Sequence, residues 1–252
     1  MSLDVVDLRN FYGHRLGTVA RHFVSRGIRK RWTNAAGLRV LGIGYATPYL
    51  GLFREEAERC LAFMPAAQGV VKWPTMRPAL SALVEELALP LPDAAVDRVL
   101  LVHALEMSHD PTALLREIWR VLAASGQLLA VVPNRRGLWA RMDTTPFGHG
   151  RPYSRLQITH LLREAWFTPV GWSEALYVPP IPRGWFLRSA VAWERAGATI
   201  SAPFAGVHIV EATKQVYRAI PARREKRQLV PALEPALAPS PRGLARAAAP
   251  DR

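Results

Sequence analysis

Cysteine and long apolar runs are almost absent from this sequence. Cys60 is the single cysteine among 252 residues, which excludes an internal disulfide and favours a reducing compartment. No apolar run approaches the roughly 20 residues that a membrane-spanning helix needs. The N-terminal MSLDVVDLRN carries acids where a signal peptide carries positive charge. These features predict a cytoplasmic protein.

The common signatures of metal and nucleophile chemistry are missing as well. The seven histidines are dispersed, and one cysteine cannot complete a zinc ligand set. The sequence has neither a Gly-x-Ser-x-Gly elbow nor a Walker loop. We therefore expect no metal ion and no activated serine nucleophile.

Positive charge is abundant but concentrated at the two ends. Of a formal net charge of +13, residues 1–39 hold eight Lys/Arg against two acids, and residues 222–252 hold seven against three. Lysine occurs only four times while Arg, Ala and Pro abound, a usage typical of GC-rich coding sequence. Basic ends can bind phosphates or anionic lipid headgroups. Two solvated appendages are the favoured interpretation, and nucleic acid stays open as a partner that is not favoured.

Residues 92–134 predict a strand–helix–strand unit. Val99–Val102 and Leu128–Val132 are apolar strand candidates, and a helical apolar pattern lies between them. Asp110-Pro111 provides an N-cap and a suitable first helical residue, and Ser125-Gly126 is expected to end the helix. The two strands should be parallel and buried on both faces.

Ligands of such sheets bind outside the carboxyl ends of the strands. This rule places His103–Glu106 and Pro133–Arg135 on the functional edge of the predicted sheet.

Short motifs follow one another in a fixed order in this part of the chain. They are Leu89-Pro90-Leu91-Pro92-Asp93, Val96-Asp97, His103-Ala104-Leu105-Glu106, Asp110-Pro111, Glu117, Arg120-Val121-Leu122, Gly126 and Pro133-Asn134. Class I S-adenosylmethionine (AdoMet)-dependent methyltransferases of the small-molecule type often read LPFPD-x-x-FD, HVLEH, DP-x-x-x-L-x-E-x-x-R-V-L-x-P-G-G and a strand ending in PN, in the same register. The chain resembles this family.

The resemblance implies an α/β, Rossmann-like class I methyltransferase fold. Its mostly parallel seven-stranded sheet has an antiparallel last strand beside the sixth and helices on both faces. AdoMet is the implied cofactor, and methyl transfer to a small or medium-sized acceptor is the implied activity, with the acceptor undefined. We expect a helical lid over 1–33, a methyltransferase-like domain over 34–221 and a disordered basic Ala/Pro/Arg tail over 222–252. The oligomeric state is not predicted.

By resemblance, the cofactor lies at the ends of the first four strands. The turn after the first strand, Leu38–Ile43, takes the place of the AdoMet-binding loop, usually an acid followed by Gly-x-Gly-x-Gly. Met64 is placed to pack on the adenine and Glu85 to bind its amino group, although a solvated acidic pair with Glu86 on a loop explains Glu85 equally well. The residues assigned to the cofactor are Gly42, Gly44, Tyr45, Ala46, Met64, Glu85, Leu87 and His103.

Two of the cofactor motifs depart from the family pattern. Gly42 replaces the acid of the first loop, and Ala46 and Pro48 replace its later glycines. The second strand, Cys60–Met64, ends without the carboxylate that binds both ribose hydroxyls. Each charge-assisted hydrogen bond lost there is worth roughly 1.5–3 kcal/mol.

Two alternative functions therefore stay open. The first is a catalytically inactive methyltransferase-like protein that serves as a binding or regulatory module. The second, suggested by the basic ends, is an RNA-directed methyltransferase or an RNA binder with a salt-sensitive affinity.

His103 is the candidate catalytic residue, because by resemblance it lies near the methyl-transfer site. A pKa near neutrality suits a general base for a hydroxyl or ring-nitrogen acceptor, although a hydrogen bond to backbone would equally explain a histidine here. The loop after Asn134 is rich in His, Arg and Tyr, and its arginines would clamp an acidic acceptor or a phosphate. The acceptor candidates are Tyr12, Glu106, Asn134, Arg135, His149, Arg151 and Tyr153.

Apolar periodicity and turn residues predict the remaining elements. One or two helices cover residues 4–32, strands lie near Leu80–Val84, 169–178 and Gly206–Thr213, and helices cover Leu156–Glu164, with Ser154 as N-cap, and Trp185–Arg195.

Overall fold

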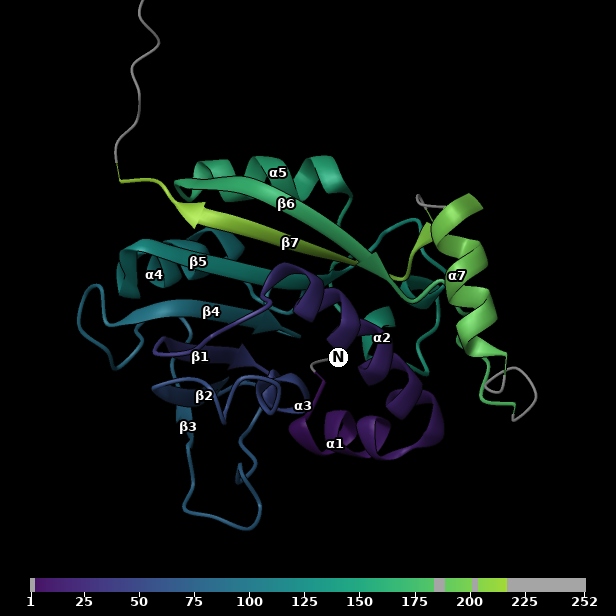
Figure 1. The fold of residues 1–252 in the computed structure, drawn as a ribbon, viewed down its shortest axis with the longest axis horizontal. Helices are drawn as coiled ribbons and strands as arrows, with labels where there is room; N and C mark the ends of the chain where they lie inside the picture. Colours follow the sequence, from purple (N-terminus) through teal and green to yellow (C-terminus); the bar gives the residue numbers. More distant parts are fainter. Residues whose placement is uncertain (1–2, 184–188, 201–203, 217–252) are drawn as a thin grey trace, which may run out of the picture. The chain divides into compact units, whose positions relative to one another are not determined.

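The computed structural model describes residues 3–183, 189–200 and 204–216, which belong to one compact unit (Figure 1). The expected tail over 222–252 lies outside the described residues. The same holds for residues 185–188, the start of one predicted helix. Over the part of the chain that is described, no helix has the length and apolar character needed to cross a membrane.

Seven strands form a single sheet in the order β3-β2-β1-β4-β5-β7-β6. The strands are β1 (Arg39–Gly44), β2 (Arg59–Pro65), β3 (Ser81–Val84), β4 (Val96–Val102), β5 (Leu122–Pro133), β6 (Phe167–Ala175) and β7 (Val207–Lys214). The first five strands pair in parallel, and β7 runs antiparallel between β5 and β6. The predicted Rossmann-like sheet with an antiparallel last strand is confirmed.

Helices cover both faces of this sheet (Figure 1). They are α1 (Val5–Gly13), α2 (Arg15–Arg31), α3 (Thr47–Leu50), α4 (Pro111–Val121), α5 (Arg155–Glu164) and α7 (Ala190–Ile200), and two short 3₁₀ helices, Trp139–Arg141 and Pro146–Gly148, follow β5. Successive strand residues point to opposite faces. Thus Leu100 packs with α1, α2 and α3, whereas Leu101 packs with α4 and α5. Burial on both faces explains the continuous apolar runs of the central strands.

The boundary between α4 and β5 differs from the prediction. The helix was expected to continue to Ser125-Gly126, but it ends at Val121, and Leu122 is already extended and pairs with Val96 of β4. Ser125-Gly126 lies inside β5, where the register shifts between the pairs that Val96 and Arg98 make. The residues after Val121, which the helical pattern had assigned to the helix, thus belong to the irregularly paired start of β5.

Two C-terminal elements are also displaced from their predicted bounds. Trp166 adopts a positive φ of 63° directly after α5, so the chain reverses at once and β6 begins at Phe167 instead of residue 169. The helix expected to end at Arg195 continues to Ile200.

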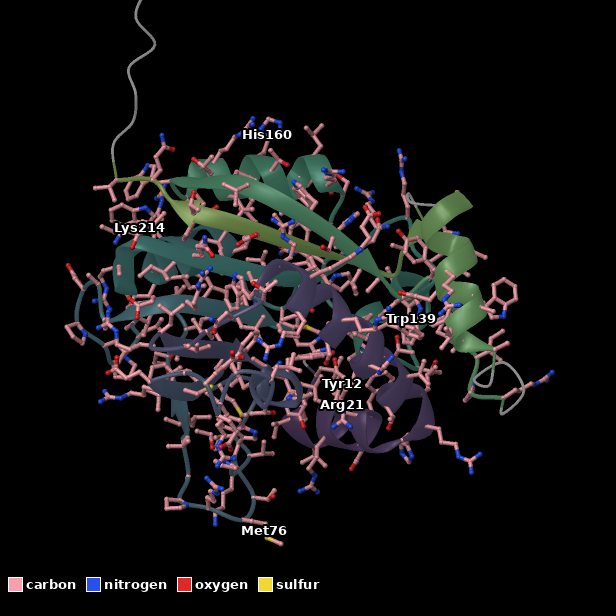
Figure 2. The ribbon with its side chains drawn as sticks, in the orientation of Figure 1. Tyr12, Arg21, Met76, Trp139, His160 and Lys214 are labelled. Atoms are coloured by element: carbon pink, nitrogen blue, oxygen red, sulfur yellow. The ribbon has the colours of Figure 1, made fainter. Side chains whose placement is uncertain are left out.

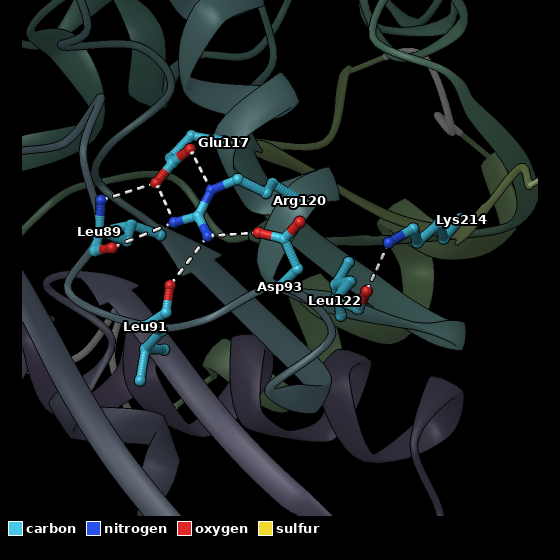
Figure 3. A network of polar contacts seen from close by, with 7 residues as sticks. All are labelled: Leu89, Leu91, Asp93, Glu117, Arg120, Leu122 and Lys214. Carbon is cyan, nitrogen blue, oxygen red and sulfur yellow. Dashed lines mark hydrogen bonds and ion pairs between the residues drawn. The ribbon is translucent and has the colours of Figure 1, made fainter.

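Arg120 of α4 holds the loop before β4 (Figure 3). Its guanidinium donates to the carbonyl oxygens of Leu89 and Leu91 and to the carboxylates of Asp93 and Glu117, at 2.6–3.1 Å. Glu117 also accepts from the backbone N–H of Leu89 at 2.7 Å. The Glu-x-x-Arg and Leu-Pro-x-Pro-Asp motifs are therefore two halves of one structural clamp.

An ion pair between α2 and β7 anchors the helix pair α1–α2 to the sheet. Arg31 donates to one carboxylate oxygen of Glu211 on β7 at 2.9 and 2.6 Å, and Glu211 is buried. Asp4 caps α1 by accepting from Val6 N, and Val5 N donates to the carbonyl of Gln68 in the loop after β2. These contacts fix α1 against the carboxyl edge of the sheet.

Replacing Arg120 by alanine should lower the free energy of unfolding by about 1–3 kcal/mol, because several charge-assisted hydrogen bonds are lost from a partly exposed site. Urea denaturation measures this change. Arg163→Ala, which removes an exposed arginine of α5, is the control and should change the free energy by less than about 0.5 kcal/mol. Equal effects of both substitutions would contradict the clamp.

The clamp should also depend on pH. The hydrogen bonds from Arg120 lower the pKa of Glu117 below its usual value, so the carboxylate stabilises the fold fully above about pH 4.3. That contribution is lost as the pH falls through the lower folded-state pKa. The stability difference between wild type and Glu117→Gln should thus be constant from about pH 5 to 7 and shrink below about pH 4, and a difference that grows in acid would be inconsistent with the assignment.

Candidate functional site at the carboxyl edge of the sheet

The turn after β1 is packed tightly against its neighbours. Gly44 has φ of +77°, and a Cβ there would lie 2.2 Å from the carbonyl oxygen of Val102, so close packing against β4 requires glycine. A Cβ on Gly42 would lie 2.6 Å from Leu50 Cδ1 and 2.8 Å from Ala46 Cβ. The position of the family's acid therefore has no room for a carboxylate in this arrangement.

Tyr12, which projects from α1 (Figure 2), centres a chain of buried polar contacts. Its hydroxyl lies 2.9 Å from the hydroxyl of Tyr49 and 2.8 Å from Nε2 of His103. Nδ1 of His103 lies 3.1 Å from Oε1 of Glu106. Both ring nitrogens of His103 thus already have protein partners.

Aromatic packing completes this cluster. The Tyr12 ring stacks on Tyr45 at a centroid distance of 5.7 Å, and His103 lies 4.9 Å from Phe147. Burial raises the pKa of Tyr12, Tyr45 and Tyr49 above the usual value for tyrosine. The three phenols therefore stay protonated at neutral pH.

His103 is also unusual in its backbone. Its φ of +51° lies in the left-handed region, which costs a non-glycine residue of order 1–2 kcal/mol. The Gln68 side chain donates to the His103 carbonyl at 2.8 Å and supports this conformation. Strain of this kind concentrates at functional sites.

A cavity of about 330 Å³ opens beside His103, at the carboxyl ends of β2, β3 and β4. Its polar lining is Gln68, Glu86, His103, Glu106, Ser108, His109 and Arg151, and the rest is Leu3, Pro65, Ala67, Ala104, Met107 and Gly150. We call it the rim cavity. A second hollow of about 400 Å³ lies between α1 and residues 143–149, and Leu3 lines both.

The structure brings only some of the predicted cofactor residues to the rim cavity. His103 lines it, whereas Gly42, Gly44, Tyr45 and Ala46 lie in the closed β1 turn. Three further residues also lie elsewhere. Met64 is fully buried, Glu85 is exposed beside the cavity-lining Glu86, and Leu87 borders another hollow next to α4.

The residues predicted to bind the acceptor also lie in several different places. Glu106 and Arg151 line the rim cavity, and Tyr12 lies against His103. His149 borders the second hollow and contacts the carbonyl of Asp143 at 2.7 Å.

The other three acceptor candidates have structural contacts or face solvent. The side chain of Asn134 bonds Ala205 O and Arg136 N, and Arg135 is exposed. Tyr153 donates to Leu105 O at 3.2 Å, and burial raises its pKa to about 12. All these assignments to cofactor or acceptor stay predictions.

Five polar site residues escaped the sequence analysis: Tyr49, Gln68, Glu86, Ser108 and His109. Gln68 and Glu86 follow the ends of β2 and β3, so the rule that ligands bind beyond strand ends could have found them. Tyr49 had no such signal, because it looks like an ordinary apolar residue of a short helix.

Comparison with known proteins finds similarity to methyltransferases. A family model described as "Methyltransferase domain" matches residues 27–130. A probable S-adenosylmethionine-dependent methyltransferase of Mycobacterium tuberculosis is 40% identical over 84 residues, which are 32% of this chain and 30% of that protein. One from Mycolicibacterium smegmatis is 38% identical over 81 residues, 31% of each chain. The chain thus matches about a third of the length of these relatives.

Solved structures show the same fold. A SAM-dependent methyltransferase of Thermotoga maritima, described as "possible histamine N-methyltransferase", has a TM-score of 0.60 at 15% identity and covers 84% of this chain and 96% of its own. The [4+2]-cyclase SpnF has a TM-score of 0.52 at 20% identity, covering 77% and 80%. Residues 27–130 are thus similar to a methyltransferase domain, the solved structures share the class I methyltransferase fold, and AdoMet is the cofactor that this similarity implies.

The residues present do not accommodate the whole of AdoMet in this arrangement. The β1 turn, where the family holds the methionine end of the cofactor, is filled by Tyr12, Tyr45 and Tyr49, and Leu50 occupies the space of the acid. The rim cavity, next to the ends of β2 and β3, is the open space beside this turn. Tyr12, which stacks on Tyr45 and contacts Tyr49, covers this turn in the present arrangement.

The linked contacts of Tyr49, Tyr12 and His103 predict that removing one hydroxyl lowers the stability of the fold more than removing the other. Tyr12→Phe leaves both His103 Nε2 and the Tyr49 hydroxyl without their partner, so it should destabilise the fold by about 1–3 kcal/mol. Tyr49→Phe removes one contact and should cost less. Urea denaturation of the single and double variants gives the coupling, and effects that add fully would show that the two hydroxyls do not interact.

Proposed function

We propose that the chain catalyses AdoMet-dependent methyl transfer to a small or medium-sized acceptor at the rim cavity. One observation carries the proposal: the cavity lies at the carboxyl ends of β2–β4, next to a histidine with a left-handed backbone. Ligands of open α/β sheets bind at this edge. The cytoplasmic location expected from the sequence stays a prediction.

In this proposal His103 acts as general base only after Tyr12 leaves its Nε2 atom. Glu106 orients the imidazole ring through its contact with Nδ1. Tyr12 thus has two roles, because the same side chain closes the β1 turn and blocks the imidazole. Methyl transfer depends mainly on alignment of the reacting groups.

The closed arrangement reduces the apparent affinity for the cofactor. When only a fraction of molecules is competent to bind, the dissociation constant rises by the inverse of that fraction. Every 1.4 kcal/mol that favours the closed form therefore weakens the apparent affinity about tenfold.

A second candidate is a binding or regulatory module without methyl-transfer activity. The specific observation in its favour is Gly42, whose environment excludes a carboxylate. Fold likeness does not decide between the two candidates, since a [4+2]-cyclase has a related fold and function resides in the site.

Titration calorimetry with S-adenosylhomocysteine tests the proposal. We expect micromolar binding to wild type, about tenfold weaker binding to Glu86→Gln because Glu86 lines the cavity, and unchanged binding to Glu85→Gln, its exposed neighbour. Absence of heat and of a thermal shift at millimolar ligand would leave the binding-module candidate.

Activity is measured separately with AdoMet that carries an isotope-labelled methyl group. A deproteinised metabolite extract supplies the acceptors, and mass spectrometry should detect the label in a small molecule. Transfer should be lost in His103→Ala.

A further inference from the structure

Two buried oxygen atoms at the rim cavity have no hydrogen-bond partner among the described residues: Oε2 of Glu106 and Oε1 of Gln68. Both side chains line the cavity and are nearly inaccessible, Glu106 being 2% and Gln68 6% exposed. Each residue uses its other polar atom on His103, through Nδ1 and the backbone carbonyl. A buried acceptor without a donor costs about 1–3 kcal/mol, and more when it is charged, so native proteins rarely retain one.

The charged lining of the cavity is mainly negative. Glu106 and Glu86 provide two carboxylates, and Ser108 holds Glu86 by donating to its Oε1 at 2.8 Å. Arg151 is the one guanidinium of the lining, and within the described residues no ion pair joins it to either acid. This local excess is notable in a chain whose net charge is +13.

Two acceptor atoms of the site, Oε2 of Glu106 and Oε1 of Gln68, thus receive no hydrogen bond from the described residues. A carboxylate or phosphate would leave Glu106 and Gln68 unsatisfied and would be repelled by both acids. An ammonium group supplies three N–H donors and one positive charge, and its hydrogen bonds to a carboxylate are charge-assisted.

We propose that the rim cavity is a binding site for an organic ammonium group, held by Glu106 and Gln68 with Glu86 as the second charge. This inference deepens the proposed function. It rests on that function only in naming the molecule that carries the ammonium group. That source is either an amine-bearing methyl acceptor or the amino group of AdoMet itself.

The test compares three probes of similar shape by titration calorimetry: 2-phenylethylamine, 2-phenylethanol and 3-phenylpropionate. Their single ring suits the apolar part of the lining. We expect the amine to bind wild type at least tenfold more tightly than the alcohol, and the carboxylate not to bind. Equal affinities, or preference for the carboxylate, would overturn the proposal.

Glu106→Gln should reduce amine affinity at least tenfold and leave alcohol affinity unchanged. Glu164→Gln makes the same charge change on exposed α5 and should have no effect. Because Glu106 also contacts His103, Glu86→Gln provides a second test that leaves His103 intact, with an expected loss of several fold. Thermal melting confirms that each variant is folded, and amine affinity unchanged in both cavity variants would contradict the site.

A competition arm identifies the source. Displacement of the amine by S-adenosylhomocysteine assigns the ammonium group to the cofactor, and simultaneous binding assigns it to the acceptor. Amine selectivity without any S-adenosylhomocysteine binding would support the site while refuting the proposed methyl transfer. Binding of S-adenosylhomocysteine without amine selectivity would refute the ammonium site while leaving the proposed methyl transfer supported.

Discussion

The hydrogen bond between the Tyr12 hydroxyl and Nε2 of His103 is the contact on which the site depends. It joins the N-terminal helices to the end of β4 and, through Tyr49, to the short helix after β1. The contact is buried, so breaking it without a substitute leaves polar atoms in an apolar environment. In the proposed mechanism the same bond controls access to the β1 turn and to the imidazole.

The rest of the chain holds this contact in place from two sides. The ion pair of Arg31 with Glu211 anchors α2 on β7, and the hydrogen bond from Gln68 fixes the strained backbone of His103. On the opposite face, the clamp of Arg120 and Glu117 holds the loop that leads into β4. A parallel sheet packed on both faces gives these anchors a rigid frame.

One βαβ unit was predictable from local, mutually consistent signals, whereas the seven-stranded sheet was predicted from the family resemblance. Pro111 after the N-cap Asp110, the helical period of α4 and the apolar runs of β4 and β5 all indicate one βαβ unit. The end of α4 was missed because Leu122 has the helical period yet pairs with Val96 on a distant strand. Tertiary pairing outweighs local propensity at such boundaries.

The site was less predictable, and the reasons are specific. The missing acid at Gly42 was visible in the sequence, but the close approach of Leu50 to this glycine depends on packing. Likewise, no spacing rule places Tyr12 against His103, which is 91 residues away. The unpartnered atoms of Gln68 and Glu106 emerge only when every buried polar group is accounted for.

The most direct test of this account is the affinity of S-adenosylhomocysteine for Tyr12→Ala compared with wild type. If Tyr12 closes the β1 turn, its removal opens the site, and the dissociation constant should fall at least severalfold. Unchanged or weaker binding to Tyr12→Ala would contradict the account, because Tyr12 would then not compete with the ligand.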